Sequence, residues 1–118
     1  MTDQPDPQGK SGTELDPEDA KLVTLARATR ARSSARQGAA VRDTDGRTYA
    51  AASVALPSLE LSALQVAVAM AVSSGAPGLE AAVVVADQPG DSAGAGAVHD
   101  VAPAVSIFFF DINGNPAG

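Results

Sequence analysis

The segment that most constrains the fold of this chain is residues 57–75, PSLELSALQVAVAMAVSSG. It contains the longest uncharged apolar run, and its large apolar residues cover every angle of a helical wheel: Leu59, Leu61, Leu64, Val66, Val68, Met70 and Val72. A helix that is apolar on all sides is typical of the centre of a small domain. We therefore predict a central helix that begins with Ser58 as its cap and closes at Gly75.

The segments around this helix predict a mixed α/β order. Asp16 and Pro17 form a strong helix start, because the first can cap and the second suits the first turn. The expected order is α-β-β-α-β-β, with a helix over 17–34, strands over 38–42 and 47–54 joined by a turn at 43–46, the apolar helix, and strands over 79–86 and 105–110. The strand over 79–86 is continuously apolar, which predicts burial on both faces.

Two polar segments fall outside this pattern. Residues 1–14 are rich in Pro, Gly and Asp, which predicts a disordered acidic tail. Residues 87–102 are too rich in Gly to favour a helix and predict a flexible loop inside a single domain over residues 15–118. The core consists mainly of Ala and Val and buries little area per residue, so association with a copy or a partner would stabilise it.

The charge and the missing cysteines limit the classes of function. The net charge of −6 comes mostly from residues 1–19, which hold six acids and one Lys, so the acidity belongs to a solvating tail or to a tail that docks on a basic partner. The chain has no Cys, which excludes disulfides and thiolate metal sites.

With no signal-like or membrane-length segment, we expect a cytoplasmic protein. The Ala-rich composition and the excess of Arg over Lys are typical of a GC-rich bacterial genome.

Several short words, taken in order, resemble the cytidine deaminase family. They are GAA at 38–40, DGRTY at 45–49, AVAMAVSSG at 67–75 and the apolar strand at 79–86. The resemblance implies a three-layer α/β/α domain with a mixed sheet, here truncated. It also implies the family's assembly into dimers or tetramers, and its chemistry, in which a zinc-bound hydroxide and a proton-carrying glutamate deaminate cytidine.

The residues that this chemistry requires are missing from the matching positions. The family's C/H-A-E word falls on Ser62, Ala63 and Leu64, where a serine is a very poor zinc ligand and a leucine cannot move a proton. The P-C-x-x-C word should follow residue 86, yet the chain has no Cys. The ribose-holding N-x-E word falls on about residues 53–55, and the word at 33–36 lacks its aromatic. We therefore expect no catalytic residues, no metal and no cofactor, and a former site that is refilled as a dry core.

The predicted function is a catalytically inactive cytidine deaminase-like protein that acts as a binding or assembly module, as a homo-oligomer or with a protein partner. One alternative is an RNA- or ribosome-associated factor that uses the basic cluster from Arg27 to Arg36. Another is a nucleoside-binding protein or cytidine deaminase, by family label only.

The candidate interaction residues are Arg27, Arg30 and Arg36 on the first helix and its end, and Phe108, Phe109 and Phe110 on the last strand. The arginines can contact phosphate or form a solvated helix face. The phenylalanines, which alternate across a strand, can fill the core or form an interface. His99 is the sole histidine of the chain and is expected in an exposed loop.

Overall fold

The computed structural model describes residues 15–117, and the tail predicted for residues 1–14 lies outside the described residues. The described chain runs in the order α1 (Pro17–Ser33), β1 (Gln37–Asp43), β2 (Thr48–Ala52), β3 (Val54–Leu56), β4 (Leu59–Leu61), α2 (Ala63–Ser73), β5 (Leu79–Ala86), α3 (Ser92–Val101) and β6 (Ile107–Phe110). No helix within residues 15–117 has the length and apolar character needed to cross a membrane.

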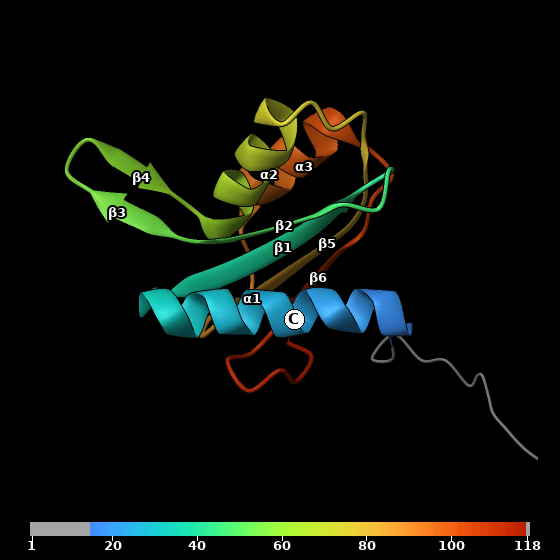
Figure 1. Cartoon of the computed structure of the whole chain (residues 1–118). Coiled ribbons are helices and arrows are strands. Elements are labelled where there is room, and N and C mark those ends of the chain that lie inside the picture. The colour runs from blue at the N-terminus through green and yellow to red at the C-terminus, as the bar shows by residue number, and fades with distance from the viewer. Residues whose placement is uncertain (1–14, 118) are drawn as a thin grey trace, which may run out of the picture.

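These elements form three layers (Figure 1). The main sheet of the described chain has the strand order β2-β1-β5-β6. Strand β1 is antiparallel to both β2 and β5, whereas β5 and β6 are parallel. Helix α1 covers one face of the sheet, and α2 and α3 cover the other. The predicted three-layer α/β fold with a mixed sheet is therefore confirmed.

Helix α1 begins and packs as its sequence predicts. The carboxylate of Asp16 accepts a hydrogen bond from the backbone N–H of Asp19 at 2.9 Å, so it caps the first turn. Leu22 and Ala26 are fully buried against the sheet. Gly38 on β1 lies so close to the backbone of α1 that a Cβ atom there would overlap the carbonyl oxygen of Ala26. This close approach requires glycine at the start of β1.

The turn between β1 and β2 is organised by a buried carboxylate. Asp43 is fully buried and accepts hydrogen bonds from the backbone N–H groups of Asp45 and Arg47 and from the hydroxyl of Tyr49, each at 2.9 Å. Burial alone would raise the pKa of Asp43, but these three donors outweigh it and lower the pKa. Gly46 has φ 90°, as the predicted turn requires.

Strand β5 lies inside the sheet and contributes to the core on both faces. Its alternate residues pack on the α1 side and on the side of α2 and α3, which confirms burial on both faces. The three phenylalanines of β6 follow the same alternation: Phe108 and Phe110 pack on the α1 side and Phe109 on the other. Phe110 is buried, whereas Phe108 and Phe109 are partly buried against the core, and the use of the three as an interface stays a prediction.

The central helix begins later than predicted. Residues 54–61 form a two-stranded hairpin, β3 and β4, with Pro57 and Ser58 in its turn, and Figure 1 shows it extending away from the main sheet. Ser62, not Ser58, caps α2, because Ser62 and Gln65 form a reciprocal capping box. The helix is also not buried all round, since Met70 is 41% and Val72 54% exposed.

The loop predicted for residues 87–102 contains a helix instead. Asp91 caps α3 by accepting a hydrogen bond from the backbone N–H of Gly94 at 2.9 Å. Gly94 is buried against α2, and a Cβ atom there would lie 2.8 Å from the Cβ of Leu64. The glycine therefore permits close helix packing that composition alone does not reveal. His99 lies on α3, and its Nε2 is 3.0 Å from the carbonyl oxygen of Val105.

Candidate functional site

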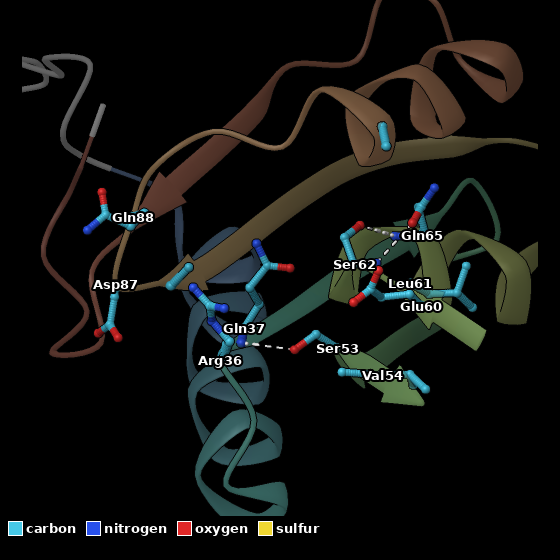
Figure 2. A pocket seen from close by; sticks show the side chains of 13 residues that line it. Arg36, Gln37, Ser53, Val54, Glu60, Leu61, Ser62, Gln65, Asp87 and Gln88 are labelled. Carbon is cyan, nitrogen blue, oxygen red and sulfur yellow. Dashed lines mark hydrogen bonds between the residues drawn. The ribbon is translucent and has the colours of Figure 1, made fainter. Parts of the chain in front are cut away.

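A pocket of about 400 Å³ lies at the N-terminus of α2, among residues from six separate segments. Figure 2 shows Arg36 and Gln37 in the middle of the view, Asp87 and Gln88 to one side, and Ser62 and Gln65 to the other. The lining consists of Arg36, Gln37, Ser53, Val54, Ala55, Glu60, Leu61, Ser62, Gln65, Ala86, Asp87, Gln88 and Ala93. Eight of these thirteen side chains are polar, so the prediction of a dry, refilled site is wrong for this pocket.

Side-chain hydrogen bonds fix the start of α2 in the pocket wall. The backbone N–H of Gln65 donates to the Oγ of Ser62 at 3.1 Å, and the backbone N–H of Ser62 donates to the Oε1 of Gln65 at 2.9 Å. The Oε1 of Gln37 accepts from the backbone N–H of Ala63 at 3.2 Å. Three backbone N–H groups at the start of α2 therefore donate to side chains that line the pocket.

Gln37 also links β1 to Ser53, the residue that follows β2. Its backbone N–H donates to the Oγ of Ser53 at 3.2 Å, and its carbonyl oxygen accepts from the backbone N–H of Ser53 at 3.1 Å. Because its side chain reaches the first turn of α2, Gln37 connects β1, the end of β2 and α2 at a single point. Hydrogen bonds therefore hold together the part of the pocket wall that contains Gln37 and Ser53.

The two positions predicted for the first zinc ligand and the glutamate have different environments. Ser62 lines the pocket, but its Oγ is engaged as the acceptor of the helix cap. Leu64 is fully buried and belongs to the core cluster beneath α2 and α3. At Leu64, the expectation of a dry core agrees with the structure.

The donor set of the site does not fit zinc. Zinc sites in proteins use thiolate, imidazole or carboxylate ligands that converge on one point. The residues of the described chain contain no cluster of three or more His, Cys, Asp or Glu side chains that could hold a metal ion. The segment that leads into α3, residues 89–93, reads PGDSA and supplies no thiolate where the P-C-x-x-C word was expected.

The rim of the pocket carries charges of both signs. Arg36 supplies one cation, while Glu60 on β4 and Asp87 after β5 supply two carboxylates, and all three residues are exposed. The lining thus has a formal charge of −1. Sequence reasoning did not predict Gln37, Glu60 or Asp87 as site residues, because segments far apart in the chain bring them together. The S-x-x-Q word at residues 62–65 was a signal that could have located the helix start.

The predicted arginine cluster is divided by the fold. Arg36 lines the pocket, whereas the guanidinium of Arg27 lies beside the turn that contains Gly114. Arg30 packs its Cβ next to Gly38 on β1. The three side chains that the sequence grouped therefore have three separate surroundings.

Comparison with known proteins places this geometry in a family. A family model described as cytidine deaminase-like matches residues 15–114. The chain belongs to the cytidine deaminase-like family. A search of curated proteins gave no match.

Two solved structures of cytidine deaminases share the cytidine deaminase-like fold with this chain. The enzyme from Burkholderia pseudomallei superposes with a TM-score of 0.73 at 21% identity, over 82% of this chain and 87% of that one. The enzyme from Mycobacterium leprae gives a TM-score of 0.64 at 18% identity, over 86% of this chain and 92% of that one. At these identities the likeness establishes the fold.

Proposed function

We propose that this chain is a catalytically inactive cytidine deaminase-like protein that binds a small polar ligand and serves as a binding or assembly module. The observation that supports this proposal is a pocket at the start of α2 lined by both polar and apolar side chains, while Ser62 and Leu64 occupy the positions expected for a zinc ligand and a catalytic glutamate. A volume of about 400 Å³ is within the usual range of small-molecule sites, about 300–1,000 Å³.

The chemistry of the lining supports binding without deamination. Hydrolytic deamination needs an activated hydroxide and a group that carries protons to the leaving amine. The hydroxyl of Ser62 is neutral and caps a helix, and Leu64 has no proton to give. The carboxylates of Glu60 and Asp87 are exposed at the rim, where water solvates them.

The test is a direct assay of the full chain. We expect no turnover of cytidine with added zinc, and no stoichiometric zinc by elemental analysis of the purified protein. The Burkholderia pseudomallei cytidine deaminase, assayed in parallel, provides the positive control. Turnover that scales with protein concentration and falls when Asp87 is replaced by Asn would overturn the proposal.

The exposed apolar side chains favour self-association as the assembly role. Leu56 and Leu59 on the β3–β4 hairpin are 58% and 48% exposed, and Met70 and Val72 lie exposed on α2. Burying such side chains between copies contributes about 25 cal/mol for each Å² of apolar area. We expect light scattering to show a dimer or larger species that Leu56→Ser with Leu59→Ser weakens. A monomer at high protein concentration would contradict this role.

A further inference from the structure

The two edges of the main sheet differ in how they are covered. At β6, the C-terminal residues fold back along the strand: the backbone N–H of Ala117 donates to the carbonyl oxygen of Phe109 at 2.8 Å, and Phe110 forms an antiparallel bridge with Pro116. At the other edge, β2 has β1 on one side, and within residues 15–117 no strand pairs with its outer side. A bare edge of this kind is a template for pairing with another strand.

The hydrogen bonds at the two ends of the β1–β2 pair determine which backbone groups of β2 point outward. The N–H of Ser53 donates to the carbonyl oxygen of Gln37 at 3.1 Å, and the N–H of Asp43 donates to the carbonyl oxygen of Arg47 at 2.8 Å. In an antiparallel pair, such directly bonded residues alternate with residues whose N–H and C=O groups point away from the partner strand. The residues of β2 that point outward are therefore Thr48, Ala50 and Ala52.

These outward groups match a second copy of the same edge. If two β2 strands pair antiparallel about a two-fold axis at Ala50, Ala50 lies opposite its own copy, and Thr48 lies opposite Ala52 of the second copy. Every residue with outward N–H and C=O groups then faces another such residue, which gives about six hydrogen bonds. Strand β2 reads TYAAA and pairs with β1 without a bulge, so it lacks the charges, prolines and bulges that protect natural edges from pairing.

The charge pattern around this edge favours a second copy over a charged partner. From residue 48 to residue 79, Glu60 is the only charged residue, and this stretch includes β2, the β3–β4 hairpin and α2. Helix α2 packs over β1 and β2, and its exposed Met70 and Val72 belong to the same uncharged region. In a two-fold contact a residue near the axis meets its own copy, so a charge there would be repelled. Arg47 and its copy would lie at opposite ends of the paired strands, about 20 Å apart.

We propose that two copies of this chain pair through their β2 edges and form one continuous sheet with four strands from each copy. This inference rests on the proposed self-association and names the surface that carries it. Because the C-terminal residues cover β6, the pairing uses the bare edge that the main sheet has within residues 15–117, and association stops at two copies. The hairpin with Leu56 and Leu59 begins directly after β2, so these exposed side chains lie beside the contact.

Amide hydrogen exchange of the full chain, followed by NMR above and below the dimer dissociation constant, tests this contact directly. A concentration series in light scattering gives that constant. Above it, the N–H of Ala50 should exchange at least about tenfold more slowly than below it, because a hydrogen bond to the second copy protects this group. The N–H of Ala51 points to β1 in both states, so its exchange should stay slow at both concentrations and provides the internal control.

A proline at position 50 tests the same contact by substitution. Because the N–H of Ala50 points away from β1, Ala50→Pro removes no hydrogen bond of the β1–β2 pair, which is the condition under which sheet edges tolerate proline. It removes the central hydrogen bonds of the dimer and should raise the dissociation constant at least about tenfold. Ala50→Ser keeps the N–H and is the matched control, with an unchanged dissociation constant. If circular dichroism shows that Ala50→Pro does not fold, the exchange experiment on the native chain decides.

The contrary results separate this contact from self-association itself. A dimer whose Ala50 N–H exchanges as fast as in the monomer, or a dimer that a folded Ala50→Pro leaves intact, would overturn the β2 contact and leave self-association in place. Slow exchange of the Ala50 N–H in the monomer would show that another segment of the same chain covers the edge, and would also overturn the proposal. A chain that stays monomeric at high concentration would contradict the self-association role and this inference with it.

Discussion

Replacing Leu64 by glutamate is a sharp test of whether the position predicted to match the family's catalytic glutamate belongs to the core. The side chain of Leu64 is fully buried in the cluster beneath α2 and α3. Buried Gly94 packs on its Cβ and leaves little room for a longer polar group. A carboxylate at this position would have to leave water, so we expect Leu64→Glu to be strongly destabilised at neutral pH.

The magnitude follows from two contributions. Loss of the buried leucine side chain removes about 1.5–3 kcal/mol of transfer free energy. Burial raises the pKa of a glutamate by up to about 3–5 units, so the folded state holds a proton that the unfolded state, with a pKa of about 4.3, has released. If the folded pKa exceeds 7, this costs about 3.7 kcal/mol at about pH 7 and about 1 kcal/mol at about pH 5. The sum approaches the whole stability of a small domain, about 5–15 kcal/mol.

The assay is urea denaturation followed by circular dichroism at several pH values. Leu64→Gln is the matched control, because it has the same shape and polarity but does not titrate. The folded Glu variant binds more protons than its unfolded form above about pH 4.3, so its stability relative to Leu64→Gln should fall as the pH rises, by about 1.4 kcal/mol per pH unit. Equal stability of the two variants at every pH would refute the reasoning and show that residue 64 reaches water.

Three further predictions concern other parts of the fold. Gly38→Ala should lower the free energy of unfolding by about 1–3 kcal/mol or more in thermal denaturation, because its Cβ overlaps α1, whereas Gly96→Ala, with open space around it, should not. Asp43→Asn should be less stable than the native chain at neutral pH in urea titrations. The difference should shrink as the pH falls below about 4, because a lowered pKa stabilises the fold only while the carboxylate is ionised. If the chain acts instead as an RNA-associated factor, Arg27→Ala with Arg30→Ala should weaken RNA binding and flatten its salt dependence in fluorescence anisotropy, and unchanged binding would exclude that role.

Local signals in the sequence were sufficient for the elements whose ends carry strong chemistry. Asp16 and Pro17 started α1, and the turn with Gly46 joined β1 to β2. The same reasoning misplaced the start of α2. Residues 54–61 pair as a hairpin, and the helix begins only at the capping box over residues 62–65. Helix α3 was missed because Gly94 disfavours a helix locally but permits contact with α2.

The sequence by itself indicated the family resemblance and part of the order of the elements, and it predicted that zinc ligands and a proton-transfer residue are absent, since these inferences depend on which residues stand at matching positions. Only the tertiary structure showed that a polar pocket persists beside Ser62 and that Leu64 is core. Gln37, Glu60 and Asp87 come from three segments far apart in the chain. Their convergence depends on the pairing of β1 with β5 and on the position of the β3–β4 hairpin, which are not encoded by any local pattern.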